Sequence, residues 1–325
     1  MEIYNSIEEM VGNTPILKLH RFGEGLGSSI LAKCEFLNPG GSVKDRIGFY
    51  MVEEAERKGL LKPGGTIVEA TAGNTGIGLA MAAAFNGYKL IAVMSEKVSK
   101  DKVNMLKCLG AETVVMPSGL SRSDPEHFMN KAIALAEQKG AWLADQFFNG
   151  SNVEAHYKST GPEIWRQTEG EVDVLVAGVG TGGTLSGAGK YLKEMKPSVK
   201  VVLADPEGSM LKDLVEGKEA SSSSYLVEGI GQDFVPGNFD MELVDDVISV
   251  SDRDSLAAAK QLFEKEALFV GSSSGCIAHA ARQYALDFEK ENKALNIVAI
   301  LPDGGRSYMS TVYDPEWLAL KLPSS

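Results

Sequence analysis

Short apolar runs alternate with segments of helical length along most of the chain. The runs are rich in Val, Ile, Leu and Ala, and they lie at 66–71, 89–95, 174–180, 200–205 and 296–301. Helices are expected between them, at 77–86, 99–109 and 185–193. Such alternation is typical of parallel strands whose two faces are covered by helices. The pattern therefore predicts an α/β fold with parallel sheets.

Four glycine-rich or polar turns interrupt this pattern, each at the end of a strand-like run. Open α/β sheets bind their ligands at that edge, so we expect these turns to carry the chemistry. They are NPGGSVKDR at 38–46, TAGNTGIG at 71–78, GVGTGGT at 178–184 and VGSSSG at 270–275.

The turn at 178–184 has the spacing of a dinucleotide-binding loop. Gly178, Gly180 and Gly183 satisfy G-x-G-x-x-G, and Asp205 follows the next strand-like run, where an NAD ribose would need a carboxylate. A glycine turn before a helix can nevertheless bind any phosphate. Four such turns are more than one dinucleotide needs. An NAD-dependent oxidoreductase is therefore kept only as an alternative from a different functional class.

The turn at 38–46 places a lysine at the start of a predicted helix. Ser42 is a candidate N-cap, Lys44 falls in the first turn, and the helix is expected to end near Gly59. A helix N-terminus is partly positive, which lowers the pKa of an amine and favours Schiff-base chemistry. The competing interpretation is an ordinary surface lysine.

The turns at 71–78 and 270–275 also precede helices. Thr71 to Thr75 offer hydroxyls, an amide and backbone N–H groups that could bind a carboxylate, although Asn74 or Thr75 could simply be an N-cap. The three serines at 272–274 have the character of a cap and a turn. The four histidines, His20, His127, His156 and His279, form no triad or ligand spacing and are expected to be ordinary helix or surface residues.

The amino-acid composition limits the classes of molecule that the protein is expected to bind. The net charge of -12 and the pI near 5.0 argue against nucleic acid and anionic membranes as partners. The apolar runs are too short to span a bilayer, and the N-terminus has no secretory pattern, so we expect a cytoplasmic protein. Cys34, Cys108 and Cys276 suggest neither disulfides nor a metal site, and Cys276 is expected to be a small buried residue. Small-molecule ligands are therefore expected.

The joint order of these motifs resembles the cysteine synthase and cystathionine β-synthase family, pyridoxal-phosphate enzymes of fold type II. The resemblance covers nearly the whole chain. It rests on VGNTPILKL at 11–19, NPGGSVKDR, EATAGNTG, AGVGTGGT, DPEGS, VEGIGQDFVP, VGSSSG and LPDGGRSYMS.

The resemblance implies a site for pyridoxal 5′-phosphate. Lys44 would carry the cofactor and act as the catalytic base, Asn74 would contact the 3-hydroxyl, and Ser273 the pyridine nitrogen. The cofactor-binding residues implied are Lys44, Asn74, Gly180, Thr181, Gly182, Gly183, Thr184 and Ser273. The substrate-binding residues implied are Thr71, Ala72, Gly73, Asn74, Thr75, Gln146 and Gly229. Asp205 would then be structural.

The family's architecture implies two three-layer domains with parallel-rich twisted sheets, similar to the tryptophan synthase β subunit. Residues 42–148 would form a smaller mobile domain that carries the substrate-carboxylate loop. Residues 1–41 and 149–325 would form the larger cofactor-binding domain, with the active site in the cleft between the two. A homodimer is implied, and docking of a serine acetyltransferase tail is left open.

The implied reaction is a β-replacement on O-acetylserine or serine through an α-aminoacrylate, with sulfide or a thiol as nucleophile, giving cysteine or cystathionine. Two departures leave the substrates open. Ala72 replaces the usual serine of TSGNTG, and Gln232 stands where serine-using members often have tyrosine. An amino-acid nucleophile, a β-elimination such as that of a dehydratase or cysteine lyase, and a non-catalytic relative are the alternatives. Acetate is favoured over water as the leaving group because no extra acid is visible.

Overall fold

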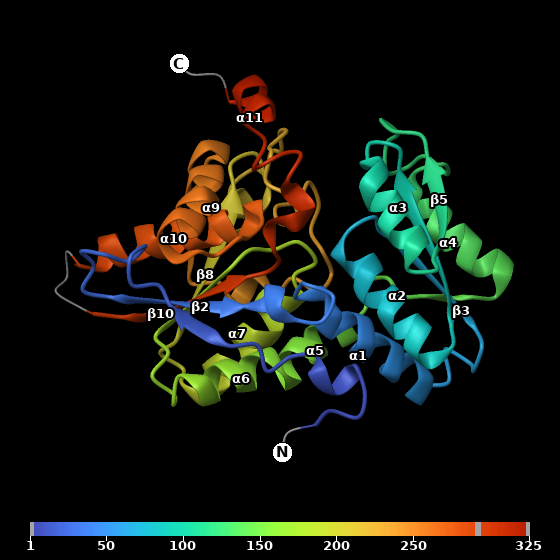
Figure 1. Ribbon diagram of the computed structural model, residues 1–325, viewed down its shortest axis with the longest axis horizontal. Helices are drawn as coiled ribbons and strands as arrows, with labels where there is room; N and C mark the ends of the chain where they lie inside the picture. The colour runs from blue at the N-terminus through green and yellow to red at the C-terminus, as the bar shows by residue number, and fades with distance from the viewer. Residues whose placement is uncertain (1–2, 290–293, 323–325) are drawn as a thin grey trace. The chain divides into compact units, whose positions relative to one another are not determined.

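The computed structural model describes residues 3–289 and 294–322 of the chain. It divides into two compact units (Figure 1). The first unit contains residues 1–11 and 38–155, and the second contains residues 12–37 and 156–325. Helix α5, Ser151–Lys158, carries the chain from the first unit into the second.

The first unit is built on a four-stranded sheet in the order β5-β4-β3-β6, with every pair parallel. Ile67 of the central strand faces a core formed with α1 and α2, whereas the next residue, Val68, faces a second core formed with α4. This strand is therefore buried on both faces, as its apolar run predicts. The elements are β3 Thr66–Ala70, β4 Lys89–Ser95, β5 Glu112–Met116, β6 Trp142–Leu143, α1 Lys44–Arg57, α2 Asn74–Asn86, α3 Lys100–Cys108 and α4 Phe128–Lys139.

The second unit is built on a six-stranded sheet in the order β1-β2-β10-β7-β8-β9. Within the described residues, β1 and β2 form its antiparallel pair, and the remaining pairs are parallel. The strands are β1 Ile16–Lys18, β2 Ser29–Cys34, β7 Val174–Ala177, β8 Lys200–Pro206, β9 Asp246–Val250 and β10 Asn296–Leu301. The helices are α6 Thr160–Gln167, α7 Gly183–Met195, α8 Leu211–Val215, α9 Asp252–Glu266, α10 Ser272–Glu289 and α11 Pro315–Lys321. Short 3-10 turns lie at Glu8–Met10, Glu35–Leu37, Met241–Leu243 and Gly305–Tyr308.

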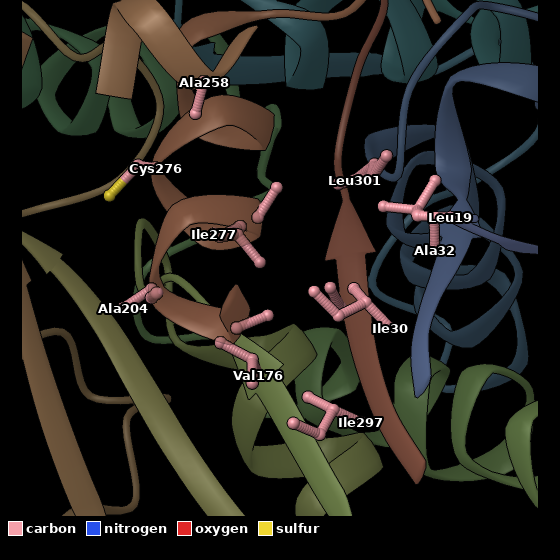
Figure 2. Packing of buried hydrophobic residues seen from close by; sticks show 14 of the residues in the cluster. Leu19, Ile30, Ala32, Val176, Ala204, Ala258, Cys276, Ile277, Ile297 and Leu301 are labelled. Atoms are coloured by element: carbon pink, nitrogen blue, oxygen red, sulfur yellow. The ribbon is translucent and has the colours of Figure 1, made fainter. Parts of the chain in front are cut away.

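Each face of this sheet has its own core. Figure 2 shows Ile30, Val176 and Ile297 of the sheet in the cluster that also contains Ile277 of α10. On the other face, strand residues such as Leu175 pack with α6 and α7. The two clusters take alternate residues of the same strands, and this fixes the register of the sheet.

The predicted α/β class and parallel sheets are confirmed, because all five apolar runs are strands. The helix after β3 begins at Asn74, earlier than expected, and the lysine-bearing helix ends at Arg57, close to Gly59 as predicted. Val43 precedes α1 with helical backbone angles and no capping side chain, and Ser42 Oγ accepts the N–H of Lys44, the capping hydrogen bond expected of Ser42. The domain bounds and the mobility of residues 42–148 stay predictions. Over the part of the chain that is described, the helices are too short or too polar to cross a bilayer.

Candidate functional site

The loop before α1 is fixed by short hydrogen bonds. Gly40 N–H donates to Asp45 Oδ2 at 2.5 Å, and Lys44 N–H donates to Ser42 Oγ at 3.1 Å. Asp45 and Arg46 are buried. A Cβ on Gly78 would lie 2.6 Å from the carbonyl oxygen of Lys44, so α2 crosses directly against the lysine's backbone. Lys44 is thus the first residue of a tightly held helix.

The turn at 71–75 leads from β3 into α2. Gly73 is the N-cap and has no side chain to close the helix end, so the interpretation of Asn74 or Thr75 as the capping residue is wrong. Gly73 N–H donates to Thr71 Oγ1 at 3.3 Å, which orders the turn. A helix N-terminus with polar side chains in its first turn is suited to an anion such as a carboxylate.

Gln146 lies beside this turn. The hydroxyl of Thr75 donates to Gln146 Oε1 at 2.6 Å, and Asn152 Nδ2 donates to the Gln146 backbone oxygen at 2.8 Å. Both Thr75 and Gln146 are buried. The structure therefore brings together two of the residues expected at a substrate carboxylate, although they are far apart in sequence.

A buried carboxylate that the sequence analysis missed lies behind Gln146. Gln146 Nε2 donates to Glu69 Oε1 at 3.0 Å, and Gln146 N–H donates to Glu69 Oε2 at 3.4 Å. Burial, and then the charge of Asp145, raise the pKa of Glu69 to about 7. The available signal was an acidic residue inside the otherwise apolar run at 66–71.

In the second unit, the glycine turn before α7 is shaped by close backbone packing. Gly182 has a positive φ of 90°, and a Cβ on it would lie 2.6 Å from Phe239 N. A Cβ on Gly180 would lie 2.3 Å from the carbonyl oxygen of Gly229. Glycine is therefore required at both positions, and α7 begins at Gly183 with no side chain on its cap residue. This end of α7 is a cradle suited to phosphate.

Thr184, in the first turn of α7, is held by a histidine. His156 is buried, its Nε2 lies 3.1 Å from Thr184 Oγ1, and its Nδ1 lies 2.8 Å from Thr160 Oγ1. The expectation that His156 is an ordinary helix residue missed this contact. His156 lies near the end of α5 and Thr160 is the first residue of α6, so no single helical period in the sequence indicated this pair.

The segment 229–232 is bonded to the glycine turn. Gly231 N–H donates to the Val179 oxygen at 2.9 Å, and Gln232 Nε2 donates to the Gly180 oxygen at 2.9 Å. Gly229 therefore lies against the phosphate cradle. Gln232 fixes a backbone carbonyl of this cradle.

The serine turn lies in the first turn of α10. Ser272 Oγ accepts the N–H of Glu228 at 3.0 Å, which links α10 to the segment that leads to Gly229. Ser274 Oγ donates to the backbone carbonyl oxygen of Asp303 at 3.4 Å. Ser273, between them, is buried. The N-termini of α7 and α10 are thus connected through the 228–232 segment.

Asp205 does not suit a ribose. It is fully buried, and its Oδ2 accepts the backbone N–H of Lys212 at 3.0 Å. Burial raises the pKa of Asp205 to about 6. The structure therefore agrees with a structural role for Asp205 and gives no support to the NAD alternative. Cys276 is buried as expected, and burial raises the pKa of its thiol to about 12.

The donor set fits pyridoxal phosphate. The second unit offers a side-chain-free helix end for a phosphate and a buried serine hydroxyl for a ring nitrogen. The first unit offers a lysine, an asparagine and a turn suited to a carboxylate. Each of these groups stands at the end of a strand or the start of a helix, where a ligand can be met by backbone N–H groups.

Comparison with known proteins gives consistent matches. The family described as "Pyridoxal-phosphate dependent enzyme" matches residues 7–303. The cystathionine beta-synthase of Apis mellifera is 46% identical over 320 residues, which cover 98% of this chain and 63% of that protein. Cysteine synthase 1 of Emericella nidulans is 43% identical over 324 residues, 98% of this chain and 86% of that protein. The crystal structure of O-ureido-L-serine synthase matches with a TM-score of 0.88 at 36% identity, covering 100% of this chain and 98% of that one.

The shares covered differ between relatives. The chain spans 63% of the Apis mellifera protein and 57% of the Rattus norvegicus cystathionine beta-synthase, to which it is 44% identical. It spans most of the fungal cysteine synthase and of the O-ureido-L-serine synthase. The chain therefore spans less than two thirds of these two cystathionine beta-synthases.

Proposed function

Because this chain belongs to the family of pyridoxal-phosphate-dependent enzymes, we propose that it catalyses a β-replacement on O-acetylserine or serine, with sulfide or a thiol as the nucleophile. The product would be cysteine or cystathionine. The similar proteins named cysteine synthase and cystathionine beta-synthase support this class of reaction.

The observation that carries the proposal is the carboxylate turn at the start of α2. Thr75 and Gln146 are joined at 2.6 Å beside a helix end whose cap residue is a glycine. An amino-acid substrate has one constant anionic group, its α-carboxylate, and this turn supplies hydroxyl, amide and helix-dipole donors for it. We assign the α-carboxylate to Thr71–Thr75 and Gln146.

Lys44 has two roles in the proposed reaction. Its amine would hold the cofactor and, when free, would take the proton from the substrate's Cα. The bound cofactor supplies the electron sink that stabilises the negative charge left at that carbon. The rigid start of α1, fixed by Ser42 and Asp45, keeps the lysine in place for both roles.

The remaining assignments concern the cofactor. Gly180–Thr184 bind its phosphate through backbone N–H groups and hydroxyls, with His156 orienting Thr184. Asn74 would contact the 3-hydroxyl, and Ser273 would contact the pyridine nitrogen. A neutral serine hydroxyl cannot keep that nitrogen protonated as an aspartate would, which favours loss of the β-substituent.

The donor and the nucleophile are proposed from the residues present. We favour O-acetylserine over serine, because acetate leaves without the acid that hydroxide would require. The whole-chain likeness to O-ureido-L-serine synthase makes a nucleophile other than a thiol the second candidate. Elimination without replacement is the third. A homodimer is also proposed, by analogy with the family.

The visible absorption spectrum tests the proposal. Purified protein loaded with pyridoxal phosphate is mixed with O-acetylserine or serine, and then with sulfide or homocysteine, while products are identified by mass spectrometry. We expect O-acetylserine to change the cofactor band and the nucleophile to restore it with formation of a new amino acid. An unchanged band with both donors would contradict the proposal, and pyruvate as the sole product would favour elimination.

Substitution of the lysine gives a sharper test. We expect Lys44→Ala to reduce turnover by at least about 10³-fold, because it removes both the anchor and the proton acceptor. The cofactor should also dissociate readily on gel filtration. Lys62→Ala, at an exposed lysine of the same unit, should retain activity and cofactor. Turnover near the original rate in Lys44→Ala would remove this lysine from the mechanism.

A further inference from the structure

Glu69 is the innermost member of a buried polar chain. Its two carboxylate oxygens accept both N–H groups that Gln146 directs toward it, from the side chain at 3.0 Å and from the backbone at 3.4 Å. Gln146 Oε1 in turn accepts the hydroxyl of Thr75 at 2.6 Å. Glu69 is 1% exposed. A continuous series of hydrogen bonds therefore connects the buried Glu69 to the turn that we assign to the substrate carboxylate.

The direction of these hydrogen bonds is set by the charge on Glu69. An ionised carboxylate only accepts, so it selects the amide NH₂ of Gln146 and turns the amide oxygen toward Thr75. The Thr75 hydroxyl then donates its proton to Gln146. In this state the proton of Thr75 is directed inward and is not offered to a carboxylate on the turn.

Protonation of Glu69 would reverse the direction of the hydrogen bonds between Glu69, Gln146 and Thr75. A neutral carboxyl group donates one hydrogen bond, and Gln146 Oε1 can accept it after a rotation of the amide. The NH₂ group of Gln146 then faces Thr75 Oγ1, and the Thr75 proton becomes available to an anion on the turn. Neutralising Glu69 also removes a negative charge that repels that anion.

The elements packed around Glu69 carry charged groups in two loops and in α1. Asp145, in the loop after β6, faces it with a like charge. Glu69, Asp145 and Arg122 line a pocket of about 110 Å³. The side chains of α4 that line this pocket are uncharged. Helix α1, which packs with α2 on the face of β3 that Glu69 shares with Ile67, carries the buried Asp45 and Arg46. Helix α2 has no charged side chain, and the paired residue on β4 is Ala92. Asp145 is therefore the group to control in any test.

We propose that Glu69 is a proton-linked positioning residue: binding of a carboxylate at the 71–75 turn is coupled to protonation of Glu69, which reverses the hydrogen bonds of Gln146 and Thr75. The inference rests on the proposed function only in placing the substrate carboxylate at this turn. It adds a residue that controls how strongly that carboxylate binds as the pH changes.

The pKa of Glu69 determines how strongly the Kd for a carboxylate changes with pH. Burial raises the pKa of Glu69 to about 7. If only the protonated form binds the anion, the apparent Kd increases as the pH rises through that value, by about tenfold between pH 6 and pH 8. At pH 7.5, binding should take up roughly three-quarters of a proton per carboxylate bound.

Propanoate is a suitable probe, since it has a carboxylate but no amine that could react with the cofactor. Its Kd for the cofactor-loaded, full-length protein is measured from the cofactor spectrum at pH 6, 7 and 8. Calorimetry at pH 7.5 in two buffers of different ionisation enthalpy gives the proton uptake. We expect the tenfold weakening and the proton uptake stated above. A Kd independent of pH, no net proton uptake, or no binding of propanoate at pH 6 would overturn the proposal.

Variants separate proton linkage from simple support. In Glu69→Gln the Kd should lose most of its pH dependence and stay within about threefold of the original protein's value at pH 6, because the amide is neutral and can donate. Glu53→Gln, at an exposed carboxylate of α1, should keep the full pH dependence. Asp145→Asn should move the midpoint of the Kd profile to lower pH. Weakened binding at every pH in Glu69→Gln would show a merely structural role and overturn the proposal.

The test does not depend on turnover. If O-acetylserine leaves the cofactor band unchanged while propanoate binds with proton uptake, the proposed reaction fails and the linkage stands. If O-acetylserine reacts while propanoate binds without proton uptake, the linkage fails and the reaction stands. Should Glu69→Gln not fold, the proton uptake of the unaltered protein decides the matter.

Discussion

At the scale of single residues, a buried ion pair stands out in the second unit. Lys33 is completely buried in β2, and its Nζ donates to Glu163 Oε2 at 2.6 Å and to Gln167 Oε1 at 3.0 Å. The other oxygen of Glu163 accepts the N–H of Asn13 at 2.9 Å. Removing the Glu163 carboxylate would therefore take a counter-charge away from a buried ammonium group.

We expect Glu163→Gln to lower the free energy of unfolding by about 3–5 kcal/mol, because the ammonium group of Lys33 loses its counter-charge where water cannot replace it. Urea denaturation followed by circular dichroism measures this. Glu171→Gln, at an exposed carboxylate after α6, should change stability by less than about 0.5 kcal/mol. Equal effects of the two substitutions would show that the buried pair contributes no more than a surface charge.

Some of the residues that matter in the structure could be predicted from the sequence, and others could not. Lys44 and Thr75 lie at the starts of helices, so local pattern made them candidates, and the family resemblance then gave them their predicted roles. Glu69, His156 and Lys33 escaped, because their roles depend on partners that are distant along the chain. Glu69 meets Gln146 across 77 positions, and Lys33 meets Glu163 across 130. No local periodicity contains such pairings.

At the scale of elements, α1 and α2 approach so closely that two glycines are required. A Cβ on Gly48 would lie 2.4 Å from the carbonyl carbon of Gly78, and a Cβ on Gly78 would lie 2.6 Å from the Lys44 oxygen. Neither neighbour is a flexible side chain that could move aside. The helix that bears Lys44 is therefore positioned by backbone contact with the helix that bears the carboxylate turn.

Gly78→Ala should therefore separate the two helices. We expect a loss of about 1–3 kcal/mol in the free energy of unfolding, together with weaker cofactor retention, because Lys44 moves with its helix. Urea denaturation and cofactor dissociation measured by absorbance test the two effects. Gly150→Ala is the control, since a Cβ there would meet no atom within 4 Å. Unchanged stability and retention in Gly78→Ala would contradict the close crossing.

Helices and strands themselves were accessible from the sequence, whereas their exact starts were not. Ser42 does supply a capping hydrogen bond to α1, whereas Asn74 has the composition of a cap and Gly73 occupies that place before α2. Cap preference is a weak local energy that packing can outweigh, and here α1 and α2 are held by their mutual contact. The class of fold was predictable because it follows from the apolar runs, which packing reinforces.

At the scale of the whole molecule, the stability of the protein should depend on the pH through Glu69. Its pKa rises from 4.5 to about 7 on folding. Between these values the folded chain holds a proton that the unfolded chain has released, so the free energy of unfolding falls as the pH rises through this window. The fall attributable to Glu69 is about 3 kcal/mol.

Comparison with the Glu69→Gln variant isolates this contribution. The free energy of unfolding of the unaltered protein, minus that of the variant, should fall by about 3 kcal/mol between pH 4.5 and pH 7.5, because other titrating groups cancel in the difference. Urea denaturation at several pH values measures it. A difference that does not change with pH would mean that Glu69 titrates near its ordinary pKa.

The order of strands in the second unit also constrains how a growing chain folds on the ribosome. Strand β10 lies between β2 and β7, yet among the described strands of this sheet it is the last in sequence and so the last to be synthesised. Until it emerges, the β1–β2 pair and the β7–β8–β9 strands cannot join, and each presents an open edge. Residues 38–155 of the first unit, in contrast, are contiguous and complete long before. A nascent chain stalled before residue 296 should therefore contain a folded first unit and a second unit that depends on chaperones.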